Sequence, residues 1–547
     1  MAKLDLQRAT PESQGISSEQ VEKLLLALND SKRLHMHSIM LLRNGKVIGE
    51  TGFYPYQKEL WHMGYSMSKS VTSMAIGFLI AEGILTLDTK IVDIFKKNVG
   101  LRGLLRQKDL TIWHLLTMTS GVGLNEVGAV AGDDWVKCFL EAPVHHDPGE
   151  EFEYNSMNSY MLSAVVTELT GETLIDYLTP RLFQPLGITR VFWESCPKGI
   201  NKGGWGLFLS VEDFAKLGQL YLDGGSFKGQ QILPREWVLE STKIQAVPPK
   251  ETGFAGYGYQ MWIGKREGSF AFNGMLGQNV LVYPDIQTVV VSTAGNDVFF
   301  HNDELEKLLA KYLPEFKAVC TPLAENPSAY RSLLRVQKAL SALEKEPVLI
   351  LRGGWGRVQK QKKDWKEHAK ELSGRHFRLE AAYVGLFPLV GQVLHNNYTA
   401  GIAEVGFSLK DDRFYLEILE GEDTRFLPVG FEKAEVTDLC FSGEYYRAAV
   451  EGSFAYNEDG RKVLTVTVSF LEEALKRRIK FFLKDDGMEV HFSETPGKDI
   501  ILDGMGFVMA EVMDHPLIRR VTEKNNANLV KIIVSQTLEP TLEAEEI

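Results

Sequence analysis

The chain has 547 residues, of which 44% are hydrophobic and 24% charged, as expected of a globular protein with more than one core. Its formal net charge of −12 argues against nucleic acid or an anionic membrane surface as a partner. No apolar run is long enough to span a bilayer, so we expect no membrane partner. The first residues lack the apolar core of a secretion signal, which favours a cytoplasmic protein over an exported one whose leader has been removed. The four cysteines lie far apart, so we expect neither a metal centre nor another cofactor.

The chain opens with a helix and a hairpin. The segment SSEQVEKLLLALND, beginning at Ser17, has helical periodicity behind a serine cap. After it, Asn44-Gly45 separates two apolar runs, which is the strongest short signal for a β-hairpin.

A mainly helical middle is predicted from about Ser66 to about Leu222. Strand patterns then return in YGYQMWIG, SFAFNG, QNVLVYP and TVVVSTAG, and the helical segment NDELEKLLAKYL follows near Leu313. Strands at both ends with helices between them predict an α+β domain, in which one antiparallel sheet is assembled from the two ends of the segment.

Three parts follow from this pattern. Residues 1–315 form the α+β domain, and residues 316–375, which are charged and helical, form a linker. Residues 376–547 carry short strands with turns about every ten residues, which predicts an antiparallel β-barrel or sandwich.

The segment Tyr65–Met74, YSMSKSVTSM, contains the first catalytic candidates. Ser66 and Lys69 are three residues apart, a spacing that puts both side chains on one face of a helix. A serine hydroxyl needs a base to become a nucleophile, and a lysine can be that base if burial lowers its pKa. The segment alone is also compatible with a capped helix whose lysine is exposed. However, the following VTSMAIGFLIAEG is apolar all round and predicts a buried helix.

Two later segments support a site. PGEEFEYNSMNSYML places Tyr154 on a loop before an apolar helix, where a tyrosine can relay a proton beside a cationic lysine. In SFAFNGMLGQNVLVYP, the glycine at position 274 leaves room for a substrate near a strand edge. The backbone N–H groups of Met275 and Ser66 would then form an oxyanion hole.

These segments resemble the serine β-lactamase and penicillin-binding-protein superfamily, and within it the class C-like branch. That branch includes family VIII esterases, D-aminopeptidases and 6-aminohexanoate-dimer-type amidases. The resemblance spans about Gly15 to Leu313 and is carried, in the family's order, by YSMSKSVTSMAIGFLIAEGILTLDTKI, LTIWHLLTMTSGV, PGEEFEYNSMNSYML, GGWGLFLSVEDFAKLGQLYLDGG and NGMLGQNVLVYPD. It implies an antiparallel sheet flanked by helices, with an inserted helical lobe.

The resemblance also implies roles. Ser66 would be the acyl-forming nucleophile, Lys69 its base and Tyr154 the tyrosine of the second motif, acting through a covalent acyl-enzyme without a metal. The β-rich tail resembles the barrels, lipocalin-like in shape, that some of these hydrolases carry. In such relatives the extra domain limits substrate size or mediates homo-oligomers.

The sequence departs from the family's pattern at two of the expected substrate-binding positions. Ser156 stands where class C β-lactamases have an asparagine, and a serine donates a hydrogen bond from a shorter arm. The third motif reads Phe272-Asn273-Gly274, where the family usually has Lys-Thr-Gly or His-x-Gly. Phenylalanine supplies no charge for the carboxylate of a penicillin-like substrate, which favours small uncharged esters or amides.

The sequence therefore predicts a serine hydrolase for small ester or amide substrates. Two alternatives stay open: a D-amino-acid peptidase or weak β-lactamase, and a penicillin-binding-like sensor without turnover. His145-His146 is interpreted as a solvated loop, because metal-ligand spacing is missing. Trp61, Trp205 and Trp262 would wall an apolar pocket or pack in the core, and tryptophans more often do the latter.

Overall fold

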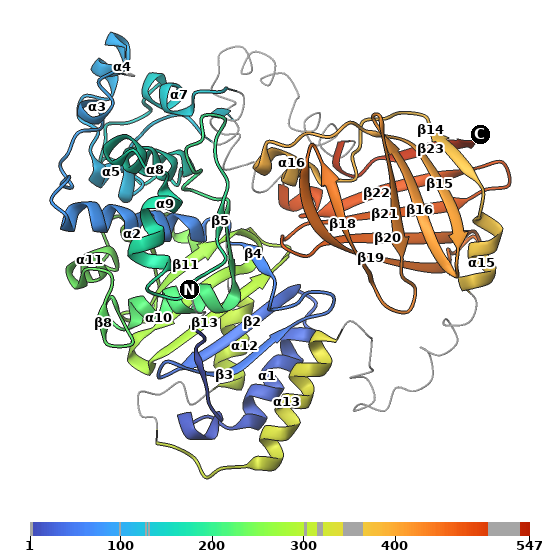
Figure 1. The fold of residues 1–547 in the computed structure, drawn as a ribbon, viewed down its shortest axis with the longest axis horizontal. Helices are drawn as coiled ribbons and strands as arrows, with labels where there is room; N and C mark the ends of the chain where they lie inside the picture. The colour runs from blue at the N-terminus through green and yellow to red at the C-terminus, as the bar shows by residue number, and fades with distance from the viewer. Residues whose placement is uncertain are drawn as a thin grey trace. The chain divides into compact units, whose positions relative to one another are not determined.

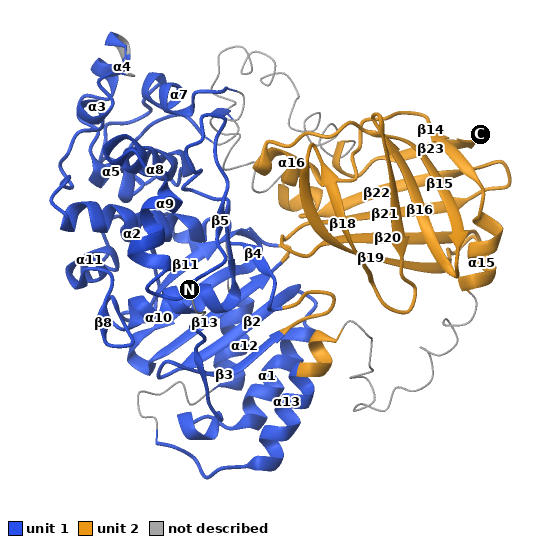
Figure 2. Ribbon diagram, in the orientation of Figure 1, with its two compact units in different colours: residues 1–51, 58–294, 298–337 blue, residues 52–57, 295–297, 338–547 orange. Residues whose placement is uncertain are grey.

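The computed structural model describes residues 4–97, 100–125, 128–129, 132–299, 303–313, 321–342, 365–501 and 537–547. The chain folds into two compact units (Figure 2). Unit 1 comprises residues 1–51, 58–294 and 298–337, and unit 2 comprises residues 52–57, 295–297 and 338–547. The division predicted from the sequence, at 315 and 375, stays a prediction.

Unit 1 is built on an eight-stranded sheet assembled from both ends of the unit (Figure 1). The strand order is β1-β3-β2-β13-β12-β11-β10-β9, and β1 and β3 form its parallel pair. The strands are β1 (Gln7–Arg8), β2 (Met36–Arg43), β3 (Lys46–Gly52), β9 (Gly256–Tyr257), β10 (Trp262–Ile263), β11 (Phe270–Gly274), β12 (Gln278–Tyr283) and β13 (Thr288–Ala294). The early strand β2 pairs with the late strand β13, and Leu41 lies opposite Val290. This pairing confirms the prediction that one sheet is assembled from the two ends of the segment.

Helices cover both faces of this sheet, which is why every residue of β2 is buried. On one face lies α1 (Ser18–Asp30), with the N-terminal capping box of Ser17 and Gln20. It packs side by side with α12 (Asp303–Tyr312). On the other face, α10 (Val211–Leu222) crosses β12, β13 and β2. Gly218 of α10 permits that approach, because a Cβ there would lie 2.6 Å from a Val280 methyl.

The helical lobe lies between β3 and β9 in the chain. Its helices are α2 (Met67–Ala81), α3 (Ile91–Ile94), α4 (Leu101–Arg106), α5 (Ile112–Leu116), α7 (Trp135–Glu141), α8 (Ser156–Thr170), α9 (Leu174–Leu178) and α11 (Arg235–Ser241). The region also holds a small sheet of β4 (Trp61–Met63), β6 (Leu207–Ser210) and β5 (Phe192–Trp193), and the hairpin of β7 (Ser226–Phe227) and β8 (Gln230–Gln231). These strands of two to four residues were not predicted, because they are too short to show a period of two.

Unit 2 is a ten-stranded antiparallel barrel that is nearly closed, so the barrel alternative holds over the sandwich (Figure 1). The strand order is β17-β16-β15-β14-β23-β22-β21-β20-β19-β18. The strands are β14 (His376–Leu379), β15 (Ile402–Lys410), β16 (Arg413–Glu420), β17 (Asp423–Val429), β18 (Glu435–Phe441), β19 (Glu444–Tyr456), β20 (Lys462–Phe470), β21 (Lys476–Leu483), β22 (Gly487–Thr495) and β23 (Thr541–Glu546). The predicted strand NLVKIIVSQ lies outside the described residues.

Three further helices are α13 (Pro327–Ser341), most of which belongs to unit 1, and α15 (Trp365–Leu372) and α16 (Leu389–His395) of unit 2. Alternation along β16 buries Phe414, Leu416 and Ile418 in the barrel core and leaves the residues between them more exposed. Phe387 fills the core near α16 and contacts the rings of Phe441 and Tyr446 at centroid distances of 5.1 and 4.6 Å. Aromatic side chains thus pack the interior of unit 2.

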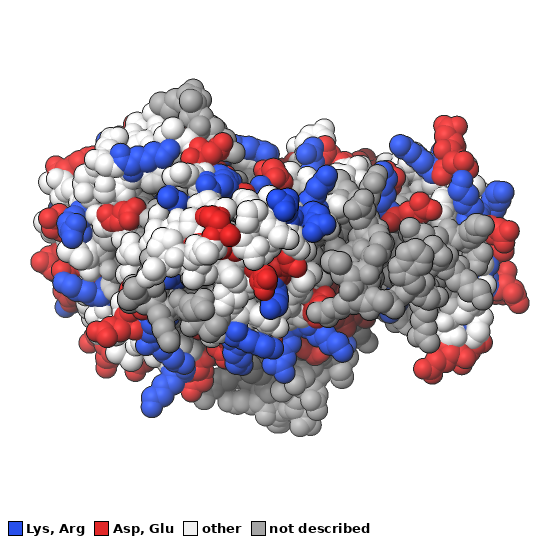
Figure 3. Space-filling view, turned by 90° about the horizontal axis from the view of Figure 1, so that it is seen from below, with Lys and Arg blue, Asp and Glu red and all other residues white. Residues whose placement is uncertain are grey.

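Surface charge is mixed on the face drawn in Figure 3, where lysines and arginines are interspersed with aspartates and glutamates over the described residues. In the described part of the chain, no helix has the length and apolar character needed to cross a membrane.

The barrel core also holds a buried ion pair. Arg477 of β21 and Glu494 of β22 approach to 2.8 Å, with 2% and 0% of their side-chain surfaces exposed. Burial raises the pKa of the Glu494 carboxyl above its ordinary value, and the Arg477 guanidinium opposes that rise. The Arg477 guanidinium therefore favours the charged form of Glu494, which the barrel interior disfavours.

We predict that R477M destabilises unit 2 by about 3–5 kcal/mol, because it leaves a buried carboxylate without its partner. Without arginine, the folded state holds a proton on Glu494 more tightly than the unfolded chain does. The loss should therefore be larger at pH 8 than at pH 5. Hydrogen exchange of β21 and β22 peptides measures it.

The matched control is R478M, because the neighbouring Arg478 side chain is exposed. It should leave exchange in these strands nearly unchanged. Equal protection in both variants would contradict a stabilising role for the buried pair.

Candidate active site

The first turn of α2 places Ser66 and Lys69 together. Ser66 is the N-cap residue, and it is the one partly exposed residue between His62 and Leu79. The helix is buried along its length because the lobe surrounds it, and only 2% of Lys69 is exposed. Lys69 Nζ lies 3.0 Å from Ser66 Oγ. The structure thus gives the serine an opening to solvent and holds the amine beneath it.

Three oxygen atoms surround the Lys69 amine. Besides Ser66 Oγ, it contacts Ser156 Oγ at 2.8 Å and the Gly204 carbonyl oxygen at 2.9 Å. The carbonyl can only accept a hydrogen bond, whereas each hydroxyl can donate or accept. An ammonium can donate to all three oxygens. A neutral amine can instead donate to Gly204 and Ser156 and accept the proton of Ser66. The arrangement fits the amine before and after it takes up a proton.

The turn before Ser66 has an uncommon backbone. Tyr65 has φ 46°, the left-handed region that few non-glycine residues adopt. Ser68 stabilises this turn: its hydroxyl donates to the Tyr65 carbonyl at 2.6 Å and accepts from Leu207 N–H at 3.2 Å. Gly64 N–H also donates to the Leu207 carbonyl at 2.8 Å. Strand β6 therefore fixes the turn that presents the serine.

Residues 154–156 bring the second motif to the lysine. Asn155 caps α8, and its amide donates to the Val122 and Leu124 carbonyl groups at 3.0 and 2.9 Å. Its side chain is therefore committed to the backbone, and Ser156 contacts Lys69. The Tyr154 ring centroid lies 4.9 Å from Lys69 Nζ. Ser66, Lys69, Tyr154 and Ser156 thus meet at one place, although they come from two distant segments.

The third motif approaches the same helix start. Gly274, at the end of β11, packs on Gly64, since a Cβ there would lie 2.5 Å from the Gly64 carbonyl oxygen. Met275 follows as the one partly exposed residue between Phe270 and Tyr283. The residue after it, Leu276, has φ 61°. The proposed pair of oxyanion donors, Ser66 and Met275, stays a prediction.

The side chains of Phe272 and Asn273 are held elsewhere, with only 0% and 3% exposed. The Phe272 ring makes an edge contact with Tyr221 of α10 at 5.4 Å. The Asn273 amide donates to Asn279 Oδ1 at 2.8 Å. They alternate to opposite faces of a sheet that is covered on both faces. Their roles as substrate contacts stay predictions. In the structure, both side chains make contacts inside the fold.

Sequence reasoning missed Gly204 as a member of the site, because a main-chain acceptor carries no side-chain signal. A Cβ at Gly204 would lie 2.8 Å from the Ser156 carbonyl oxygen. At Gly203, with φ +64°, a Cβ would lie 2.5 Å from the Ser159 carbonyl oxygen. The Gly-Gly pair therefore lets this loop lie against α8. In the sequence, this pair of glycines was the signal that could have indicated a close approach of the backbone here.

Of the other sequence candidates, Trp262 contacts this group, and the histidine pair and the other two tryptophans make different contacts. His146 Nε2 is 3.5 Å from Glu153 Oε2, and the described residues contain no group of three or more potential ligands that could hold a metal. Of the tryptophans, Trp205 stacks on Trp135 in the lobe at 5.8 Å. Trp61 lies beneath the Arg190 guanidinium at 3.9 Å. Only Trp262 contacts a candidate catalytic residue among these ring contacts, and it is stacked on Tyr154 at 5.4 Å.

Comparison with known proteins gives the class that this fold and site define. Residues 21–312, more than half of the chain, match the family model Beta-lactamase. The chain belongs to the β-lactamase family, whose fold includes β-lactamases and transpeptidases. The resemblance recognised from the sequence is thereby confirmed.

Several known proteins are similar to this chain. Protein flp of Staphylococcus aureus (strain N315) is 31% identical over 199 residues, which cover 32% of this chain and 39% of that protein. The chain thus spans about two fifths of the length of that relative. The 6-aminohexanoate-dimer hydrolase of Paenarthrobacter ureafaciens is 24% identical over 298 residues, covering 47% of this chain and 72% of that protein. The solved octameric penicillin-binding protein homologue from Pyrococcus abyssi has a TM-score of 0.45 and 19% identity, covering 86% of this chain and 97% of that one.

We predict that S68A slows the labelling of Ser66 by a fluorophosphonate about tenfold, because the left-handed turn at Tyr65 loses its side-chain support. S70A is the matched control, since the buried Ser70 hydroxyl also donates to a backbone carbonyl, that of Gln260, at 2.8 Å. Both should lower stability by about 1–2 kcal/mol, and only S68A should slow labelling. Equal labelling rates would show that Ser68 supports the fold alone. Intact-mass spectrometry follows the reaction.

Proposed function

We propose that this chain is a serine hydrolase that cleaves small, uncharged ester or amide substrates through a covalent acyl-enzyme on Ser66. The observation that carries the proposal is the 3.0 Å contact between Lys69 Nζ and Ser66 Oγ at a buried helix start. Nucleophile and base at hydrogen-bond distance, with the base held by further groups, is the arrangement that nucleophilic catalysis requires.

In the first half-reaction, Ser66 Oγ bonds to the substrate carbonyl carbon while its proton passes to Lys69 Nζ. The carbonyl oxygen becomes an oxyanion, for which we assign the N–H groups of Ser66 and Met275. When the oxyanion collapses, the bond to the leaving alkoxide or amine breaks, and the leaving group takes up a proton. Tyr154, above the lysine, is the group we assign to deliver it, and the phenolate then takes the proton held by Lys69, which returns the amine to its neutral form.

In the second half-reaction, water adds to the acyl carbon and gives a proton to the neutral Lys69 amine. The ester bond to Ser66 then breaks, Ser66 Oγ takes that proton from Lys69, and the acid leaves with the serine regenerated. Ser156 and the Gly204 carbonyl hold the amine in place through both halves.

The substrate class rests on the third motif. Phe272 stands where many family members have a cation, and its side chain is packed against Tyr221. A substrate carboxylate therefore has no partner from that position, which favours uncharged esters and amides over penicillin-like compounds. The similarity to a 6-aminohexanoate-dimer hydrolase supports an amide or ester bond as the target.

The test compares p-nitrophenyl butyrate with the β-lactam nitrocefin and a fluorophosphonate probe. Multiple turnovers of the ester, with Ser66 labelled by the probe, support the proposal. Nitrocefin hydrolysis at comparable kcat/KM would favour a β-lactamase instead. Labelling of Ser66 without ester turnover would favour a sensor.

We predict that S66A lowers kcat for p-nitrophenyl butyrate at least about 10³-fold, because it removes the nucleophilic oxygen. S73A is the matched control, since Ser73 is a buried serine on the same helix whose hydroxyl oxygen has no hydrogen-bond partner among the described residues. It should leave kcat within about twofold. Retained ester hydrolysis in S66A, measured by p-nitrophenolate release, contradicts the assignment.

For Lys69, the informative variant is K69M, which keeps the length and packing of the side chain but removes the base. We expect kcat to fall by about 10²–10⁴-fold, the usual size of a general-base contribution. Labelling of Ser66 by the fluorophosphonate should slow in parallel, because the hydroxyl is no longer activated. Near-parental labelling in a folded K69M protein would assign the base to another group.

A further inference from the structure

The Tyr154 ring belongs to a stack of aromatic rings outside the loop that carries it. Trp262 of β10 stacks on Tyr154 with a centroid distance of 5.4 Å and an interplanar angle of 26°. Phe254, which precedes β9, stacks on the same indole at 4.8 Å and 27°. Trp262 is therefore in face contact with two rings, and only 5% of its surface is exposed.

A fourth ring closes the stack from the side. Tyr257 of β9 makes edge contacts with Trp262 at 4.9 Å and 84° and with Tyr154 at 6.2 Å and 89°. Face and edge contacts are both favoured arrangements of aromatic rings and add about 0.5–1.5 kcal/mol each to area burial. Burial, with Tyr154 beside it, holds the pKa of the Tyr257 phenol well above its usual value, so this ring is neutral.

The sheet fixes the indole. Trp262 pairs with Ala271 of β11 on one side and with Tyr257 of β9 on the other. Its backbone is thus held by two neighbouring strands, whereas Tyr154 lies on a loop. The more rigid partner of the pair is Trp262.

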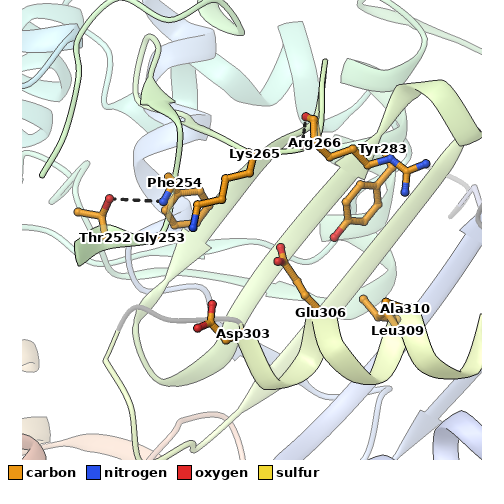
Figure 4. A pocket seen from close by; sticks show the side chains of 12 residues that line it. Thr252, Gly253, Phe254, Lys265, Arg266, Tyr283, Asp303, Glu306, Leu309 and Ala310 are labelled. Carbon is orange, nitrogen blue, oxygen red and sulfur yellow. Dashed lines mark hydrogen bonds between the residues drawn. The ribbon is translucent and has the colours of Figure 1, made fainter. Parts of the chain in front are cut away.

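The outer ring of the stack forms the wall of a pocket of about 240 Å³ (Figure 4). Phe254 lines it together with Lys265 and Tyr283 from the sheet region and Glu306 from α12. The backbone N–H of Phe254 donates to Thr252 Oγ1 at 3.5 Å, a contact within the turn that carries the ring. The stack thus runs from a partly open pocket wall to the tyrosine beside Lys69.

We propose that Trp262 is a positioning residue, whose indole face sets the place of the Tyr154 ring above the Lys69 amine. The inference rests on the proposed function, since it assigns Tyr154 a proton to deliver. Lys69 Nζ lies 4.9 Å from the Tyr154 ring centroid, so a displaced ring changes the position of the phenol relative to the amine. Trp262 itself touches no reacting atom.

A double-mutant cycle tests the inference. W262L should lower kcat for p-nitrophenyl butyrate about tenfold with KM within about twofold, because proton delivery suffers and binding does not. Y154F keeps the ring but removes the hydroxyl that the stack positions. In the Y154F background, W262L should therefore cost less than about twofold in kcat. A merely structural tryptophan would cost the same factor in both backgrounds.

Further variants supply the controls. W262F retains a stacking face and should stay within about threefold of the parent. W237L is the matched control, because Trp237 is 6% exposed and its ring contacts a different tyrosine, Tyr259, at 5.3 Å in a tilted arrangement. It should lower stability as W262L does without the kcat loss. If W262L does not fold, F254L loosens the stack from its partly exposed end and enters the same cycle.

The outcomes are distinct. A kcat loss in W262L or F254L that disappears in Y154F supports the positioning role. Equal losses in both backgrounds, or no loss in the parent, overturn it while leaving the proposed function intact. Near-parental turnover in Y154F alone overturns the role proposed for Tyr154 and this inference with it.

Discussion

The site depends on one buried amine. Lys69 is placed in the first turn of a helix that is surrounded by protein, where a charged group loses its hydration. Its three oxygen neighbours replace that hydration, and they come from the start of α2, the start of α8 and the loop before β6. Because the three oxygen atoms come from three segments, the relative placement of these segments determines how the amine is held.

Close backbone approaches and hydrogen bonds around the site fix the relative placement of these segments. Gly204 and Gly274 allow backbone to lie directly against α8 and against the turn before α2. Ser68 joins the turn at Tyr65 to β6, and Asn155 ties the start of α8 to the loop at Val122. The polar groups around Ser66 are thus paired with backbone, which holds the four side chains of the candidate site in register.

The departures from the family's pattern acquire a physical meaning in this setting. Ser156 has a shorter side chain than asparagine, and it still reaches the lysine at 2.8 Å. The loop at Gly204 lies directly against Ser156 at the same place. Phe272, by contrast, adds to the core beside α10. Family membership is established by the match over residues 21–312, while the preference for uncharged substrates rests on Phe272 and is our proposal.

The sequence by itself determined the local features: the capped helix α1, the hairpin at Asn44-Gly45, the buried helix behind Ser66 and the strand alternation of the barrel. These depend on periodicity and on neighbours within a few residues, so they can be recognised in one dimension. It also predicted one site with Ser66, Lys69, Tyr154 and Ser156, because side-chain chemistry is visible in a motif, and the structure brings these four side chains together. Only the tertiary structure decided that a glycine carbonyl holds the lysine, that Phe272 faces α10 and that Trp262 stacks on Tyr154. Those contacts join residues separated by tens to more than a hundred positions, and the packing of distant elements, which no local pattern encodes, brings them together.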